Sequence, residues 1–298
     1  MDSVKRLELT SLLEILPPVE FCCIYGSSLH PNNSDKTSMI DYILGVADPR
    51  QWHAENLKNN PSHYASWMAL VEHEWYCFYL LVLNMVRLGG ARLITDVADD
   101  IGVGVHFNPF ITHNDRRFKY GVVRMHDLVQ DVLGRERFYL SGRLQKPMYI
   151  SIFQVNIILD SLGIAELNSV NLKAATSAAL LLLPSKFNEE ELYAKICGLS
   201  YSGDIRMLFA EDKNKVKKIV QGQFNLFQTM YKPTLEEYAA QDLLRFSSST
   251  QINIMQDCDL STVSSLVSSL PWQLRDLMGS KLGEKKIIVG ADRTVQTG

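Results

Sequence analysis

The residues best suited to chemistry stand at the end of one apolar segment and inside the next. Cys22-Cys23-Ile24-Tyr25 runs directly into Gly26-Ser27, and Asp41 lies within the apolar segment Met39–Leu44. Glycine has no Cβ, so its backbone N–H can approach a phosphate closely. A carboxylate inside a strand is costly to bury unless it binds a positive group, and a divalent metal ion is the obvious partner. The pair predicts a phosphate-binding turn followed by an acidic metal ligand.

This layout resembles the nucleotidyltransferase superfamily, in which a Gly-Ser turn holds the triphosphate and an acidic strand binds Mg²⁺. A Gly-Ser pair after a strand is also commonly just a turn. The superfamily usually has two acids one residue apart on the second strand, whereas Ile43 occupies the second position here. A second ligand must then come from elsewhere, and Asp35, Asp48 and Asp204 are the candidates, although Asp35 and Asp48 could equally be turn formers.

Further polar segments add basic groups. Lys119, beside Tyr120-Gly121, can meet a phosphate as a point charge. Arg143 and Lys146 flank a glycine and a proline, as in a rigid loop that binds an anion. The segment Gly198–Met207 combines two glycines, two hydroxyls, an acid and an arginine between two expected helices, and a structural acid–arginine bridge is the alternative interpretation.

The segment Trp52–Tyr64 is rich in histidine and asparagine, and the plain interpretation is a polar surface helix with a capping Asn. His53 and His63 are ten positions apart, which does not fit a helical i,i+4 metal pair, so a zinc site is disfavoured. The segment Gly102–Asn108 carries small residues that allow close backbone approach.

The elements that must position these residues differ between the two halves of the chain. The first half alternates apolar runs with turns, and the second half has helical periodicity, so an α/β or α+β first domain precedes a helical one. We expect helices at Ser3–Leu16, Gln51–Asn59, Met125–Leu133, Asn168–Leu183, Glu189–Cys197, Asp212–Tyr231 and Thr234–Arg245, and strands at Glu20–Tyr25, Met39–Val46, Val103–Thr112, Phe118–Arg124 and Pro147–Phe153.

The composition of the chain excludes several classes of protein. The 298 residues are 46% hydrophobic with a formal net charge of −3, which is typical of a globular protein and excludes an overall basic nucleic-acid binder. Five cysteines without a CxxC pair favour a reducing compartment. The longest apolar run, Trp75–Val86, is too short to span a membrane. Neither a transit-peptide nor a secretory pattern stands at the N-terminus, so a signal is expected to be absent or already removed.

Taken in order, the polar segments resemble one family. It is the mitochondrial translocator assembly and maintenance family, whose members are matrix CDP-diacylglycerol synthases, that is, phosphatidate cytidylyltransferases. Each motif is short, but the ordered set across residues 20–231 is highly specific. The matching motifs are Tyr25-Gly26-Ser27, Met39-Ile40-Asp41-Tyr42, Trp52-His53 with Asn56-Leu57, His63-Tyr64, Gly102-Val103-Gly104-Val105 with Phe107-Asn108, Lys119-Tyr120-Gly121-Val122, Gly142–Pro147 and Gly198–Met207.

The resemblance implies an α+β protein: a nucleotidyltransferase-fold mixed sheet with helices at 1–155, a helical winged-helix-like domain at 156–246, and a C-terminal helical segment and tail at 247–298. It implies CTP, Mg²⁺ and phosphatidic acid as reactants, no nucleic acid, and a peripheral place on the matrix side of the mitochondrial inner membrane, in the pathway to cardiolipin. The implied roles are catalysis by Asp41, Ser27 and Asp204, with Asp41 and Asp204 binding the metal; nucleotide binding by Gly26, Ser27, Lys119 and Tyr201; and phosphate or phosphatidate binding by Arg143, Lys146 and Arg206.

Two departures from the family pattern stand out. Residues 71–87 look like an insertion, and family members tend to continue past this C-terminus with a basic, membrane-associating segment. Lys213, Lys217 and Lys218 are candidates for contact with anionic lipid, or else for a solvated helix face. Two other functions remain open: a nucleotidyltransferase with another acceptor, and a non-catalytic assembly factor of the import machinery.

Overall fold

The computed structural model describes residues 9–29, 38–65, 90–100, 103–134, 139–152, 164–201, 214–247, 253–276 and 278–280. The chain divides into two compact units, which are treated separately below. Unit 1 comprises residues 1–129 and 147–162, and unit 2 comprises residues 130–146 and 163–298. The expected domain boundary at residue 155 stays a prediction. The compact units differ from it by grouping residues 130–146 with the helical half.

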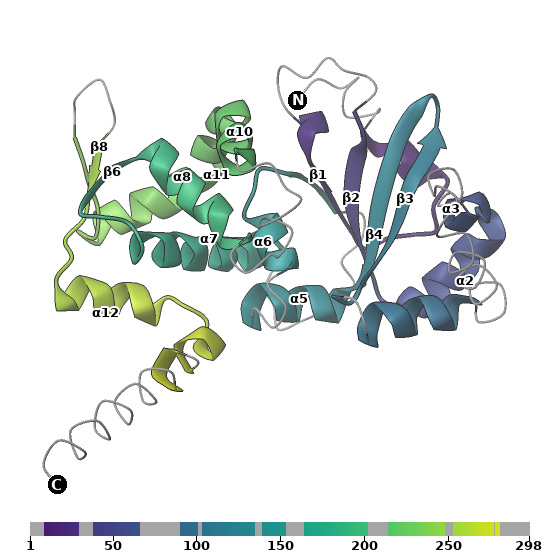
Figure 1. The fold of residues 1–298 in the computed structure, drawn as a ribbon. Coiled ribbons are helices and arrows are strands. Elements are labelled where there is room, and N and C mark those ends of the chain that lie inside the picture. Colours follow the sequence, from purple (N-terminus) through teal and green to yellow (C-terminus); the bar gives the residue numbers. More distant parts are fainter. Residues whose placement is uncertain are drawn as a thin grey trace, which may run out of the picture. The chain divides into compact units, whose positions relative to one another are not determined.

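Unit 1 is built on a five-stranded sheet with the order β3-β4-β2-β1-β5 (Figure 1). The sheet is mixed, because β2 and β4 pair in parallel while the other neighbours are antiparallel. All five strands predicted from apolar runs are present, so the coarse α+β class is confirmed. Their bounds are β1 Phe21–Tyr25, β2 Ile40–Val46, β3 Val105–His113, β4 Arg116–Arg124 and β5 Tyr149–Ile152.

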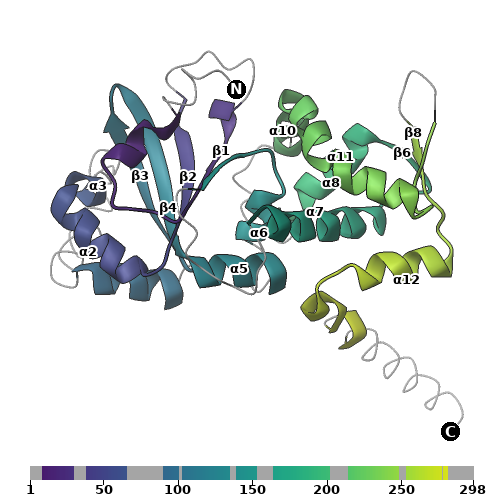
Figure 2. The ribbon, with the colours of Figure 1, turned by 180° about the vertical axis from the view of Figure 1, so that it is seen from behind.

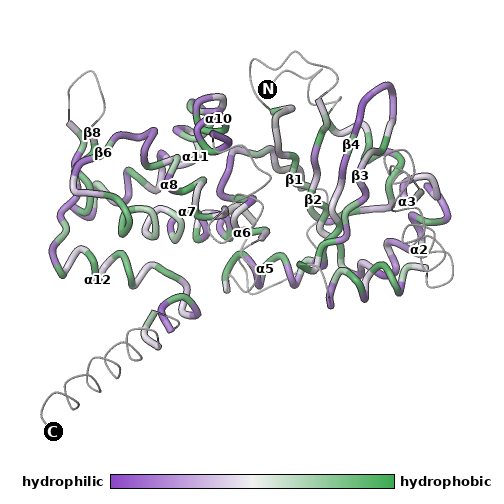
Figure 3. The backbone as a smooth tube through the Cα atoms, in the orientation of Figure 1, coloured by the Kyte–Doolittle hydropathy of each residue, from purple (hydrophilic) through white to green (hydrophobic). Residues whose placement is uncertain are grey.

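The hairpin between β3 and β4 turns on two residues. Asn114 and Asp115 have φ angles of 48° and 58°, in the left-handed region that Asn and Asp tolerate better than most side chains. A two-residue turn with both central φ values positive matches the right-handed twist of the paired strands. Figure 3 shows hydrophilic residues gathered at this tip of the hairpin.

One face of the sheet is covered by apolar and aromatic packing. Tyr42 from β2 and Tyr120 from β4 are fully buried there with Trp52 of helix α2 (Pro49–Asn59). The Tyr42 hydroxyl donates to the carbonyl of Leu9 at 2.7 Å, which ties the N-terminal segment onto the same face. This segment forms the short 3-10 helix η1 (Ser11–Glu14), within the range where a helix was predicted.

Helix α2 starts where it does because Asp48 caps it. The Asp48 carboxylate accepts from the N–H groups of Arg50 and Gln51 at 2.9 and 3.2 Å, and Pro49 follows in the first turn. Asp48 follows the C-terminal end of β2, whereas Asp41 lies near its start, about 20 Å away along a strand of this length. Of the two interpretations of Asp48, the structure therefore favours the turn former over the second metal ligand.

Unit 2 is built mainly of helices (Figure 2). These helices pack around an aromatic core. Tyr193, Phe227 and Tyr231 are fully buried, and the ring centroids of Tyr193 and Phe227 are 5.3 Å apart. Asn188 caps the N-terminus of helix α8 (Glu189–Leu199) with a full capping box, in which Glu191 is the partner. The main helices are α5 Met125–Gly134, which begins in unit 1, and α6 Leu140–Leu144, α7 Ile164–Leu180, α8 Glu189–Leu199, α10 Lys215–Gly222 and α11 Phe224–Ala240.

The prediction of one continuous helix over 212–231 is wrong. Helix α10 ends at Gly222, and Gln223, with φ −128° and ψ 22°, separates it from α11. The helix predicted at Thr234–Arg245 is in turn the second half of α11, which continues through Pro233. The apolar stripe gave no sign of the break, because its three- and four-residue spacing persists across both helices.

A second sheet in unit 2 was not predicted. Its strands have the order β6-β8-β7 and are only two or three residues long, too short for alternation to be visible. The described part of the C-terminal region adds a helix, α12, capped by Asp259. The bounds are β6 Lys186–Asn188, β7 Arg245–Phe246, β8 Asn253–Met255 and α12 Leu260–Ser268.

Several predictions lie outside the described residues. They concern the start of the N-terminal helix, Asp35, the apolar segment 71–87, Asp204 with Arg206, and Lys213. Within the described part of the chain, no helix is both long and apolar enough to cross a membrane.

Candidate functional site

The Asp41 carboxylate lies against the backbone of Gly26. Gly26 has a φ of +94°, and a Cβ built there would stand 2.7 Å from Asp41 Oδ2. Tyr25 is the register partner of Asp41 across the β1–β2 pair, so the turn after β1 starts beside this carboxylate. Asp41 is the one residue of β2 that is not buried, which revises the premise of a fully buried acid. It is a half-buried carboxylate beside an open glycine backbone.

Lys119 stands on the other side of Asp41. The two are register partners in the parallel β2–β4 pair, and parallel partners project to the same face of a sheet. The Lys119 ammonium lies 4.8 Å from the ring centroid of Phe107. A Cβ on Gly121 would be 2.6 Å from the Phe107 ring, so this glycine leaves room for the ring that Lys119 contacts. A carboxylate and an ammonium thus lie next to each other at the same end of β2 and β4.

The turn after β1 forms the single 3-10 turn η2 (Ser27–Leu29), in which the Leu29 N–H donates to the Gly26 carbonyl at 3.2 Å. The side chain of Ser27 is not described, so its predicted role stays a prediction. Its neighbour Ser28 is buried, and within the described chain its hydroxyl has no hydrogen-bond partner. A buried hydroxyl without a partner is uncommon and fits a turn built to receive an oxyanion.

Behind Lys119, on the opposite face of the sheet, a buried hydrogen-bond network surrounds Tyr120. Its hydroxyl accepts from the amides of Asn56 and Asn108, both at 2.7 Å, and lies 3.0 Å from His63 Nδ1. The Asn56 amide also donates to the Tyr64 hydroxyl at 3.0 Å. The expected polar surface helix is therefore wrong for this face of α2. Its polar side chains point inward, because Tyr120 on β4 supplies a hydroxyl for them.

The network keeps its histidines neutral. Burial lowers the pKa of His63 and of His106 to about 4, and it lowers that of His53 well below its usual value. The hydrogen bonds agree with this, because the Tyr120 hydroxyl already accepts two amide donors and has one proton left to donate to His63. The cluster thus fixes α2 and α3 (Ser62–Ala65) on the sheet and is not an acid–base pair.

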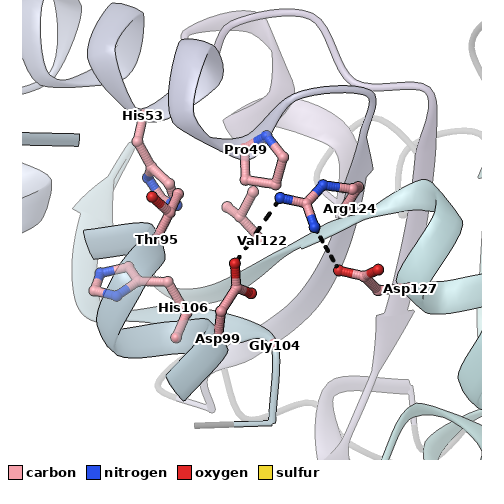
Figure 4. A pocket seen from close by; sticks show the side chains of 10 residues that line it. Pro49, His53, Thr95, Asp99, Gly104, His106, Val122, Arg124 and Asp127 are labelled. Carbon is pink, nitrogen blue, oxygen red and sulfur yellow. Dashed lines mark hydrogen bonds and ion pairs between the residues drawn. The ribbon is translucent and has the colours of Figure 1, made fainter. Parts of the chain in front are cut away.

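A small pocket opens beside this network (Figure 4). His53 and His106 line one side, with ring centroids 5.1 Å apart. Arg124 lines the other side with Asp127 and Asp99, at nitrogen–oxygen distances of 3.0 and 3.9 Å. Since two carboxylates accompany the single arginine and both histidines are neutral, the pocket offers no net positive charge to a phosphate.

The segment predicted as an anion-binding loop in unit 2 is partly helical, because Gly142 and Arg143 lie within α6 and only Lys146 follows it. The buried Asp131 carboxylate accepts from the N–H groups of Leu140 and Ser141 at 2.6 and 3.0 Å, at the start of α6. Asn171 of α7 donates to the Ser141 carbonyl and accepts from the Gln145 amide, both at 3.0 Å. These buried bonds specify the backbone that carries Arg143 and Lys146.

The loop contacts the end of α8. A Cβ on Gly142 would lie 2.6 Å from Ser200 Cβ, so the glycine is needed for the approach. The Lys146 ammonium lies 4.1 Å from the ring centroid of Tyr201, and the Lys215 ammonium lies 5.5 Å from the same ring. The pKa of Lys146 is lowered to about 8, mainly by burial and to a smaller extent by the nearby charges of Arg143 and Lys215.

The structure therefore groups the predicted residues by unit. Gly26, Asp41 and Lys119 come together in unit 1, and Arg143, Lys146 and Tyr201 come together in unit 2, whereas Asp204 and Arg206 lie outside the described chain. Sequence reasoning missed Ser28 and Lys215. A serine after Gly26-Ser27 was visible but not distinctive, and Lys215 was concealed within a lysine-rich segment.

Comparison with known proteins identifies the relationship. The sequence matches the family described as "Phosphatidate cytidylyltransferase, mitochondrial" over residues 9–78 and 81–297. The chain belongs to this family. It is 38% identical over 218 residues to the mitochondrial phosphatidate cytidylyltransferase of Homo sapiens, a match that covers 72% of this chain and 43% of the relative. It is 35% identical over 258 residues to that of Bos taurus, covering 85% of this chain and 69% of the relative.

The cytidylyltransferase family relationship extends to distant animals. The Caenorhabditis elegans protein of the same name is 30% identical over 268 residues, covering 89% of this chain and 74% of the relative. For several of the relatives the match is shorter than the relative itself, since the chain spans 43% of the human protein and 57% of the Mus musculus protein. The family motifs that led to Asp41, Lys119 and the 142–147 loop all lie inside the matched residues.

Proposed function

We propose that this protein is a phosphatidate cytidylyltransferase that converts CTP and phosphatidic acid to CDP-diacylglycerol and pyrophosphate. The observation that carries the proposal is the contact between the Asp41 carboxylate and the Gly26 backbone, with Lys119 as the register neighbour of Asp41. Family membership supports the choice of substrates, because the relatives are named for this reaction. We also propose that unit 1 has the nucleotidyltransferase fold and that unit 2 is winged-helix-like, since short strands flank its helices.

The residues of unit 1 would bind the nucleotide. The N–H groups of the turn at Gly26 and Ser27 would hold the β- and γ-phosphates, and Lys119 would donate to a phosphate oxygen. The nucleophile is the phosphate oxygen of phosphatidic acid, which attacks the α-phosphorus of CTP while the bond to pyrophosphate breaks. A phosphate monoester with a second pKa of about 6 is mostly ionised at neutral pH, so no strong general base is required.

Asp41 would also hold Mg²⁺. A carboxylate oxygen is a ligand that Mg²⁺ prefers, and the missing Cβ of Gly26 keeps Asp41 Oδ2 accessible from the phosphate turn. The metal, when bound, neutralises charge on the leaving pyrophosphate. A second carboxylate ligand would come from Asp204 or Asp35. In unit 2, Arg143 and Lys146, together with Arg206, would donate to phosphatidate oxygens, while Tyr201 would contact the nucleotide.

We further propose a peripheral place on the matrix side of the mitochondrial inner membrane. The relatives are named as mitochondrial, and lysines 217 and 218 are exposed on α10, where they would meet anionic headgroups. High salt or carbonate should release the protein from isolated inner membranes. Its retention in the carbonate pellet would contradict this placement.

The deciding experiment compares Asp41→Asn with Asp48→Asn in the purified protein. CDP-diacylglycerol and pyrophosphate are measured with CTP, Mg²⁺ and phosphatidic acid. Asp41→Asn should lower turnover by at least ~100-fold, the scale for removing one key electrostatic group. Asp48→Asn makes the same chemical change beyond the far end of β2 and should keep near-normal turnover, because asparagine is also a good helix cap.

A melting curve accompanies both variants. The free energy of unfolding of Asp41→Asn should lie within about 1–2 kcal/mol of the wild-type value, since removal of an active-site charge seldom destabilises a fold. If Asp41→Asn forms CDP-diacylglycerol at the normal rate, Asp41 is not the metal ligand. If the wild-type protein releases no pyrophosphate from CTP and phosphatidic acid, the proposed reaction itself is wrong.

A further inference from the structure

Two ammonium groups from distant parts of the chain converge on one tyrosine ring in unit 2. Lys146 follows the end of α6, and Lys215 is the first residue of α10. Their nitrogens lie 4.1 and 5.5 Å from the centroid of Tyr201. We propose that Lys215 is a phosphate-binding residue that acts with Lys146 beside Tyr201, and that this pair of ammonium groups selects a phosphate monoester over a diester. The inference deepens the proposed function, on which it rests.

The local electrostatics make Lys215 an unusual choice for a purely structural residue. It stands in the first turn of α10, where the helix dipole disfavours a cation. Its positive charge also reaches Lys146, whose pKa it lowers in addition to the larger effect of burial. Two ammonium groups beside the same ring attract an anion more strongly than either group does alone.

The rest of the site is held rigidly around these groups. The Tyr231 hydroxyl donates to the carbonyl of Gln145, the residue before Lys146, at 2.8 Å. The N–H of Tyr201 donates to the Gly198 carbonyl at 3.0 Å and so continues the end of α8. Because Tyr231 and Gln145 are themselves buried, the position of Lys146 beside the ring is set before any ligand arrives.

The charge of the phosphate group decides which ligand the two ammonium groups prefer. A phosphate monoester carries about −1.5 to −2 at pH 7, whereas a phosphodiester carries a single negative charge. A monoester also has one more terminal oxygen to accept charge-assisted hydrogen bonds from two ammonium groups. Phosphatidic acid is a monoester and most other membrane phospholipids are diesters, so the site would discriminate by headgroup charge.

The test compares Lys215→Gln with Lys186→Gln and Lys215→Arg. Lys186 is the control lysine, because it is exposed on β6 of the same unit and has no part in the proposed sites. The assay uses phosphatidic acid in neutral detergent micelles, so that general attraction to an anionic surface is small. Lys215→Gln should raise the KM for phosphatidic acid by about 10-fold and leave kcat within about 3-fold, as expected for one lost charge-assisted hydrogen bond. Lys186→Gln should change neither the KM nor kcat, and Lys215→Arg should largely restore the KM.

A binding measurement separates this inference from the catalytic proposal. Reductive ¹³C-methylation gives each lysine an NMR signal, and methyl phosphate and dimethyl phosphate serve as monoester and diester probes. In the wild type, methyl phosphate should shift the Lys146 and Lys215 signals at concentrations at least ~10-fold below those that dimethyl phosphate requires. Lys215→Gln should abolish this preference.

Each result has a definite meaning. If Lys215→Gln and Lys186→Gln behave alike in both measurements, Lys215 does not bind the phosphate and the inference fails. If the two phosphate probes shift the lysine signals equally, selection by charge fails. If the wild type shows the monoester preference but makes no CDP-diacylglycerol, the site stands and the proposed reaction fails.

Discussion

Replacing Gly26 with alanine tests whether the glycine exists to keep the Asp41 carboxylate in place. Alanine at a φ of +94° is strained by about 1–2 kcal/mol whatever its surroundings. The new Cβ would also lie 2.7 Å from Asp41 Oδ2, closer than real contacts allow. The carboxylate stands at the end of a short side chain, so it would rotate away at a further cost of about 0.5–1.5 kcal/mol for leaving its rotamer.

A double-mutant cycle separates these two costs. With Asp41→Ala in the background, the nearest Asp41 atom to the new Cβ is the existing Cβ, at 3.8 Å, which is an ordinary contact. Gly26→Ala should then cost only the backbone strain of about 1–2 kcal/mol. In the wild-type background the loss should exceed this by about 0.5–1.5 kcal/mol, which is the coupling between the two positions.

Urea denaturation gives the stabilities, and CDP-diacylglycerol formation gives the activity. Gly26→Ala should lower turnover by roughly 100-fold while the protein stays folded, because a displaced carboxylate no longer serves the phosphate turn. Two outcomes would refute the reasoning. One is equal destabilisation in both backgrounds, and the other is normal turnover in Gly26→Ala despite measurable strain.

Three further outcomes follow from the contacts. Gly142→Ala should lower the free energy of unfolding by about 1–3 kcal/mol and raise the KM for phosphatidic acid, since its Cβ would meet Ser200 Cβ at 2.6 Å. An unchanged urea midpoint would contradict this packing. Tyr120→Phe should cost about 1–3 kcal/mol in the same assay, because two buried amide donors lose their acceptor. The free energy of unfolding should fall from pH 7 to pH 5 by roughly 2 kcal/mol for each of His63 and His106. Their pKa values in the folded protein, near 4, lie below that of histidine in the unfolded chain, so the unfolded state binds the extra proton. Equal urea midpoints at both pH values would argue against buried neutral histidines.

The sequence was most informative where local chemistry decides the structure. The strands of unit 1 were predictable because apolar runs end at clear turn residues, and Asn188 marked the start of α8 through its capping box. Gly26 and Asp41 could be paired in advance because Gly26 follows one such strand and Asp41 lies within the next. Their contact itself depends on the antiparallel register that aligns Tyr25 with Asp41.

The features that were missed depend on partners distant in the chain. The polar face of α2 resembles a surface, and only the Tyr120 hydroxyl, 64 positions after Asn56, makes it a buried network. The α10–α11 break is invisible because both helices continue one apolar stripe. The role proposed for Lys215 depends on its position beside Tyr201 and Lys146, and no spacing in the sequence predicts that position.

The parallel pairing of β2 with β4 has a consequence for how the site forms during folding. The β3–β4 hairpin closes over a two-residue turn, but Ile40 pairs with Phe118, 78 positions later in the chain. Pairing two strands that are distant in the chain costs loop-closure entropy before their contacts can stabilise the fold. The β2–β4 pairing should therefore form late and slowly. Asp41 and Lys119 become neighbours only in that step. In refolding experiments, nucleotide binding should therefore appear with the slowest phase of sheet formation, after the hairpin and the helices have already formed.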